Sequence, residues 1–100
     1  RLSYIIEYSP EAEEHIRRLT ARQQRIVLDT VDRQLLNEPE VETRNRKPMR
    51  PNPVAPWELR IANLRVYYEV KDEPGFIVTV LAIGVKERNE VGIGRERIKL

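Results

Sequence analysis

The sequence predicts an α+β fold in which two helices pack on an antiparallel sheet. Three patterns carry this prediction. Residues 4–8 (YIIEY) form a short β-branched and aromatic run of the kind found in strands. Two stretches with helical apolar spacing follow between residues 9 and 37. Apolar residues then alternate with polar ones over residues 57–61 and 64–70, and residues 76–85 are apolar almost throughout, which is typical of a strand covered on both faces.

The composition predicts one small folded domain over residues 1–100. Hydrophobic residues make up 40% of the chain and charged residues 34%, a balance that is typical of globular proteins. The chain has no cysteine, which excludes a disulfide scaffold, a thiolate nucleophile and cysteine-based metal sites. No apolar run approaches the ~20 residues of a membrane span, and no signal segment opens the chain. A cytoplasmic location is therefore expected.

The first helix is expected to begin at Ser9 and to end near Leu19. Ser9 is a good N-cap residue, and Pro10 suits the first helical position because no intrahelical N–H is needed there. Ala12, Ile16 and Leu19 then recur at helical spacing and form one apolar stripe. A short amphipathic helix should therefore follow the first strand directly.

The second helix is expected to run from Thr20 to about Asn37. Thr20 and Gln23 have the spacing of a capping box, in which each side chain accepts a hydrogen bond from the other residue's backbone N–H. Pro39 prevents the helix from continuing. With almost no linker between them, the two helices are expected to form a hairpin. The buried face of the second helix is predicted to contain Val27, Leu28, Val31 and Leu35.

A proline-rich, basic stretch separates the helices from the later strands. Residues 39–56 contain five of the seven prolines, which excludes a central strand or a helix interior. Residues 44–50 read RNRKPMR, with four cations and no acid. An ordered loop of this length is uncommon unless it has a function. Arg46, Lys47 and Arg50 are therefore candidates for binding a polyanion, with an ordinary solvated surface as the alternative.

The hairpin centred on residues 62–63 gives the sharpest inference about a site. A symmetric turn there places Arg60 directly opposite Arg65, and like charges in that position cost stability. Two facing guanidinium groups make sense if an anion binds between them, because each can bind a phosphate bidentately. The alternative is that Glu58 and Glu69 neutralise the pair as a ladder of surface salt bridges.

The same register predicts which other side chains share the face of the arginines. Tyr67 lies on that face, where it would be able to stack on a nucleic-acid base. His15 is the only histidine, and its place on an acidic helix favours a surface or boundary residue over a general base. No His/Asp/Glu cluster has the spacing of metal ligands, so neither a metal nor another cofactor is expected.

These segments, taken in order, resemble the RelE/ParE superfamily of toxins from prokaryotic type II toxin–antitoxin pairs. The resemblance is strongest over residues 57–70, with WELRI and LRVYYEV, and over residues 80–89, with VLAIGVKERN. It extends over nearly the whole chain. It implies an N-terminal strand, a two-helix hairpin and a three-stranded antiparallel meander. It also implies a cognate antitoxin protein as partner.

The resemblance further implies roles for individual residues. RelE-type members cleave mRNA on the ribosome, and by this resemblance Arg65, Arg60 and Lys86 take the catalytic positions on or beside the sheet. ParE-type members instead poison DNA gyrase, and an inactive toxin fold is a third alternative. We expect the first of these functions, a ribosome-dependent mRNA endonuclease. The RNA-binding residues are then expected to be Arg88, Tyr67, Arg46, Lys47 and Arg50.

Two positions depart from the RelE-type pattern. Glu58 stands where the best-known ribosome-dependent enzymes have lysine, and Gly92 falls near the position of their C-terminal tyrosine. Arginine cannot easily accept a proton, because its pKa lies above ~12. The proton acceptor of an RNA-cleaving reaction is therefore left open between Glu58 and Glu69.

Overall fold

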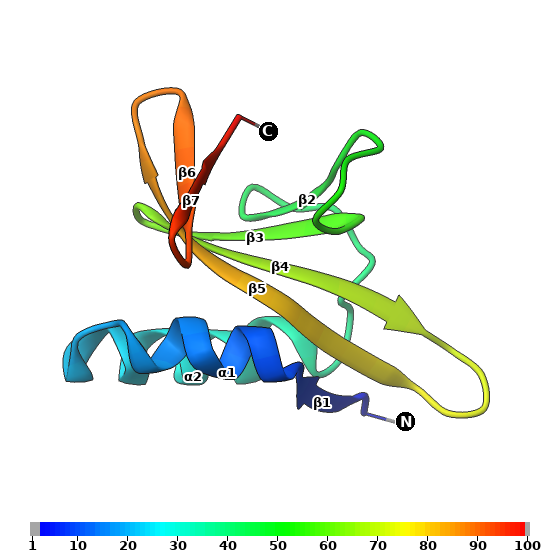
Figure 1. Cartoon of the computed structure of the whole chain (residues 1–100). Coiled ribbons are helices and arrows are strands. Elements are labelled where there is room, and N and C mark those ends of the chain that lie inside the picture. Colours follow the sequence, from blue (N-terminus) through cyan, green and yellow to red (C-terminus); the bar gives the residue numbers. More distant parts are fainter. Residues whose placement is uncertain (1–2, 100) are drawn as a thin grey trace.

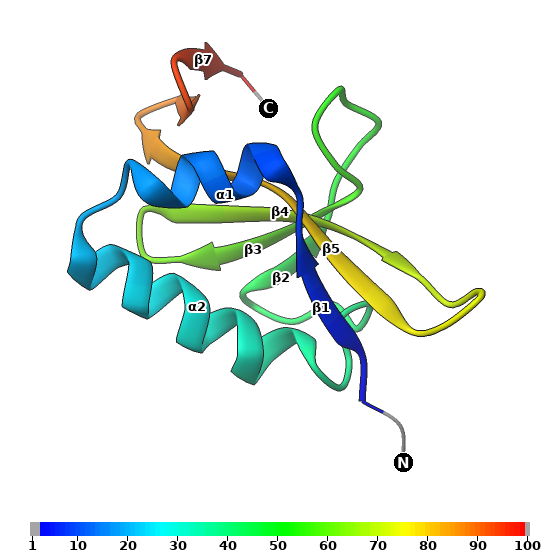
Figure 2. The ribbon, with the colours of Figure 1, turned by 60° about the horizontal axis from the view of Figure 1, so that its bottom comes forward.

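The computed structural model describes residues 3–99 and has the predicted α+β architecture (Figure 1). Both helices lie on one face of the sheet, while the proline-rich loop and a C-terminal hairpin rise on the opposite face, called here the outer face (Figures 1 and 2). In chain order the elements are β1 (Ile5–Tyr8), α1 (Pro10–Arg17), α2 (Ala21–Leu35), β2 (Arg46–Pro48), β3 (Trp57–Ile61), β4 (Leu64–Lys71), β5 (Ile77–Glu87), β6 (Glu90–Ile93) and β7 (Glu96–Ile98).

The sheet contains the predicted meander and extends beyond it on both sides. The strand order is β2-β3-β4-β5-β6-β7, with antiparallel pairing throughout. β1 pairs in parallel with the first part of β5, on the edge that β6 occupies further along. The short edge strand β2 ends at Pro48, as expected for a proline in a sheet. The charged residues after β5 form two further strands, β6 and β7.

Both predicted helix starts are confirmed. The Ser9 hydroxyl accepts a hydrogen bond from the backbone N–H of Ala12 at 3.0 Å. Thr20 and Gln23 form the complete capping box, with distances of 3.0 and 3.1 Å. The helices end slightly earlier than expected, at Arg17 and Leu35. These local signals therefore fixed the beginning of each helix better than its end.

The prediction that Leu28 belongs to the buried face of α2 is wrong, because its side chain is 40% exposed. Val27, Val31 and Leu35 are fully buried and follow one another at intervals of four residues. Leu28 is turned about 100° around the helix axis from Val27. It therefore falls at the margin of a narrow apolar stripe.

Apolar residues pack on both faces of the central strands, as predicted for β5. The larger core lies between the helices and the sheet. On the outer face a second, smaller group of buried residues, called here the outer cluster, packs beneath the proline-rich loop and β6. Gly84 permits the close approach of β6, because a Cβ atom there would overlap the side chain of Val91. The outer cluster consists of Ala55, Tyr67, Ala82, Val91 and Ile93.

A register shift in the β4–β5 ladder determines which side chains of β5 enter each core. Tyr67 pairs with Ala82 and Tyr68 with Val80, which leaves Leu81 as an extra residue. The extra residue reverses the alternation of side chains, so that Val80 before it and Ile83 after it both face the helices.

Side chains of Ser9, the N-cap of α1, and of His15 within α1 occupy the gap that β1 and β6 leave along the edge of β5. The Ser9 hydroxyl donates to the carbonyl of Leu81 at 3.1 Å, and the backbone N–H of Ile83 donates to Nδ1 of His15 at 3.2 Å. His15 is half-buried, in agreement with its predicted place at a boundary. Since its Nδ1 accepts a hydrogen bond, the ring must be neutral in this arrangement.

We expect His15 to make folding sensitive to mildly acidic pH. Burial lowers the pKa of His15, as does the charge of Arg18, while Glu11 and Glu14 oppose the change. The unfolded chain takes up a proton near the ordinary pKa of about 6.5. The stability from His15 is therefore complete above that pH and is lost as the pH falls through the lower folded pKa.

The test compares urea unfolding of the wild type with that of His15→Asn, whose amide oxygen can replace Nδ1 as acceptor. When the pH is lowered from about 7.5 to 5.5, the free energy of unfolding of the wild type should fall by up to about 1 kcal/mol more than that of the variant. This difference is the size of one net hydrogen bond. Identical pH dependence of the two proteins would contradict this role.

Candidate functional site

A groove with a volume of ≈ 610 Å³ runs along the outer face, between the proline-rich loop and the end of the chain. Its walls come from β2 and the loop on one side and from β6 and Lys99 on the other, with β3 and the end of β5 between them. Glu58 is its only acidic lining residue among residues 3–99. We call it the cationic groove because its lining includes Lys47, Arg50, Arg60, Lys86 and Lys99.

Glu58 neutralises the two facing arginines of the hairpin, of which only Arg60 lines this groove. The predicted register is confirmed, with Arg60 paired across the hairpin to Arg65. One carboxylate oxygen of Glu58 lies 2.8 Å from Nε of Arg60, and the other lies 3.9 Å from Nε of Arg65. Glu69 instead pairs with Lys71 at 3.6 Å. The salt-bridge alternative thus holds for Glu58 and not for Glu69.

Arg65 is committed to the hairpin turn. Its side chain is only 11% exposed, and Nη1 donates to the carbonyls of Ala62 at 2.7 Å and Leu64 at 2.9 Å. Ala62 adopts a φ of 53°, which costs an L-residue roughly 1–2 kcal/mol. The guanidinium of Arg65 therefore helps to hold a turn that its sequence does not favour, and Arg65 does not line the groove.

Tyr67 is buried and cannot stack on a base in this arrangement, contrary to the expected RNA-binding role. Its ring has no exposed surface because the outer cluster covers it. Its hydroxyl is buried next to the Glu58 carboxylate without a well-formed hydrogen bond. Burial, followed by the charge of Glu58, raises the pKa of Tyr67 above its ordinary value. The hydroxyl therefore stays protonated beneath the floor of the groove.

Arg46 is also unavailable for RNA binding, because it is buried and hydrogen-bonded. Its Nε donates to the carbonyl of Val41 at 2.9 Å, and Nη1 donates to the carbonyl and side-chain oxygen of Gln34 at 2.8 and 2.9 Å. Arg46 pairs in register with Leu59, a residue of the larger core. It therefore fastens the end of α2 to the loop that follows.

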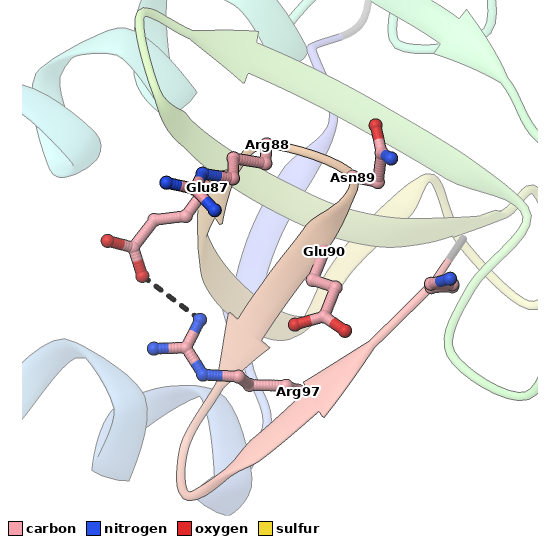
Figure 3. Close-up of a pocket in the computed structure, with 6 residues that line it drawn as sticks. Glu87, Arg88, Asn89, Glu90 and Arg97 are labelled. Atoms are coloured by element: carbon pink, nitrogen blue, oxygen red, sulfur yellow. Dashed lines mark hydrogen bonds and ion pairs between the residues drawn. The ribbon is translucent and has the colours of Figure 1, made fainter.

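The other predicted residues are accessible, but they do not all meet. Arg60, Lys86, Lys47 and Arg50 line the cationic groove, and Lys47 lies 3.5 Å from Glu42. Arg88 lies in the turn between β5 and β6 and lines a neighbouring pocket of ≈ 500 Å³, which shares Asn89 and Lys99 with the groove (Figure 3). Across that pocket Glu87 and Arg97 form an ion pair of 3.0 Å.

Lys99 and Asn52 line the groove and were not among the predicted site residues. Asn52 orders the loop wall: Nδ2 donates to the carbonyls of Arg50 at 2.7 Å and Ala55 at 2.9 Å. Its Oδ1 accepts from the N–H groups of Val54 at 2.8 Å and Ala55 at 3.0 Å. An asparagine between two prolines is a signal for such a turn. No local signal placed Lys99 beside the loop.

Neither a metal centre nor a membrane span is found among residues 3–99. In this range no three His, Asp or Glu side chains lie together as a metal ion would require. The helices of the same range are too short and too polar to cross a bilayer.

We expect the Glu58 carboxylate to stabilise the fold by separating two like charges. Glu58→Gln should lower the free energy of unfolding by about 1–3 kcal/mol, because Arg60 and Arg65 then face each other uncompensated. A double-mutant cycle with Arg60→Ala, measured by urea unfolding, should show coupling of about 0.5–3 kcal/mol. Strictly additive effects would show that the pair does not interact.

Arg46 should matter for stability rather than for binding. Arg46→Ala is expected to lower the free energy of unfolding by about 1.5–3 kcal/mol, because it leaves three oxygen acceptors without their charged donor. Arg46→Lys is the matched control: it keeps the charge but cannot form the fork, so it should recover little of the loss. Thermal unfolding of both variants checks this, and a fully stable Arg46→Lys protein would refute it.

Comparison with known proteins supplies the family. A family model described as the ParE toxin of the type II toxin–antitoxin system, parDE, matches residues 6–90. No curated protein matches the chain. The matched span includes both helices, the meander and the Glu58–Arg60–Arg65 cluster, but not β7 or Lys99. The chain therefore belongs to the ParE toxin family of type II toxin–antitoxin systems, within the RelE/ParE superfamily, and an antitoxin is its implied partner.

Proposed function

We propose that this toxin acts by binding DNA gyrase and that it does not cut RNA. The observation that carries the proposal is the internal engagement of the two arginines expected to be catalytic. Arg65 directs its Nη1 to backbone carbonyls of its own turn, and Arg60 pairs with Glu58. A toxin that acts by binding a protein needs no free catalytic pair.

RNA cleavage requires catalytic groups that are not free in this site. Attack by a 2′-hydroxyl requires a proton acceptor within reach and positive charge directed at the phosphoryl oxygens. Glu58, the carboxylate in the groove, is already ion-paired with Arg60. The Tyr67 hydroxyl is covered, and Nδ1 of His15, on α1, accepts a hydrogen bond from the backbone N–H of Ile83. These engagements favour binding over catalysis.

Ribosome-dependent mRNA cleavage remains the second candidate, and one observation favours it. Four of the residues predicted for that function line a single groove, namely Arg60, Lys86, Lys47 and Arg50. In that reading Glu58 is the better proton acceptor, since it lines the groove with Arg60 and Lys86, whereas Glu69 does not.

The two functions are separated by two assays on the same purified toxin. In the first, gyrase supercoils relaxed plasmid DNA in the presence of increasing toxin. In the second, programmed bacterial ribosomes receive the toxin and the message is mapped by primer extension. We expect inhibition of supercoiling and an intact message. The cognate antitoxin should restore gyrase activity and serves as the control. Cuts within translated codons together with unimpaired gyrase would overturn the proposal.

A further inference from the structure

The cationic groove presents positive charge that the described residues do not neutralise. Arg60 pairs with Glu58, and Lys47 pairs with Glu42. Arg50, Lys86 and Lys99 also line the groove and form no ion pair with residues 3–99. Three free cations thus come from three elements: the loop, the end of β5 and the residue after β7.

The walls of the groove suit an extended chain of anions. The loop that carries Arg50 is held in shape by four hydrogen bonds to Asn52, so the groove exists before a partner arrives. Met49 and Val91 give the same groove apolar surface beside its cations. A nucleic-acid backbone combines these properties, because its charged phosphates alternate with less polar sugars.

We propose that the cationic groove binds the phosphate backbone of DNA held by gyrase, so that the toxin binds the gyrase–DNA complex more tightly than gyrase alone. This inference rests on the proposed function. The protein-binding surface then lies elsewhere on the molecule, and the groove adds a second, electrostatic contact.

Such a contact has a characteristic salt dependence. Each phosphate that a cation neutralises adds about 0.9 to the slope of log affinity against log salt for duplex DNA. Three contacts should make the DNA-dependent part of the affinity fall about 40-fold between roughly 50 and 200 mM salt. Binding to gyrase without DNA should lack this component.

The experiment measures the affinity of labelled toxin for gyrase alone and for gyrase loaded on a DNA duplex. The groove variant is Arg50→Ala/Lys86→Ala/Lys99→Ala. Its control removes the same charge from the exposed side of α2, as Arg22→Ala/Arg25→Ala/Arg33→Ala. DNA should increase the affinity of the wild type and of the control for gyrase. The groove variant should bind gyrase alone as tightly as the wild type does, but DNA should not increase its affinity. Thermal unfolding verifies that both variants fold.

The outcomes distinguish this inference from the function on which it rests. Equal affinity with and without DNA, or equal loss in both variants, would overturn the groove contact while leaving gyrase as the target. No binding to gyrase under either condition would overturn the proposed function itself. A parallel arm uses an RNA strand with toxin alone. If the wild type binds RNA but not gyrase, and the groove variant does not bind RNA, the groove would be assigned to RNA instead.

Discussion

One strand, β5, is hydrogen-bonded to three other strands and to the helical layer. It pairs with β4 along its length, with β1 over its first part and with β6 over its last. Between β1 and β6 its edge has no strand partner, and an unpaired buried backbone group costs about 1–3 kcal/mol. Ser9 and His15 provide the missing partners. The helical layer is thereby joined to the sheet by polar bonds as well as by apolar packing.

The extra residue at Leu81 determines which side chains of β5 enter each of the two cores. By reversing the alternation of side chains, it lets β5 supply Val80 and Ile83 to the helical core and Ala82 to the outer cluster. The outer cluster in turn holds the proline-rich loop and β6 against the sheet. The outer cluster therefore supports both walls of the cationic groove, because Ala55 lies in the loop and Val91 in β6.

The features predicted from the sequence are those governed by nearby residues. The N-caps at Ser9 and Thr20 and the pairing of Arg60 with Arg65 follow from short-range spacing, and all are confirmed. Arg46 and Lys47 look alike in a basic run, but pairing with β3 turns one towards the core and the other to the groove. The burial of Tyr67 depends likewise on a loop and a strand far away in the chain. Long-range contacts of this kind leave no local pattern from which to predict them.

The network around Asn52 has a consequence for how this protein meets other molecules. Irregular loops usually lose conformational entropy when they bind, and that loss weakens the complex. Here the prolines restrict the backbone, and Asn52 fixes what freedom remains, so most of the entropy is lost when the chain folds. The hydrogen bonds that stabilise the fold therefore also hold the loop in one conformation before a partner binds. The same hydrogen bonds that cost freedom during folding allow the loop to engage a partner as a rigid body, at a rate set by diffusion and charge.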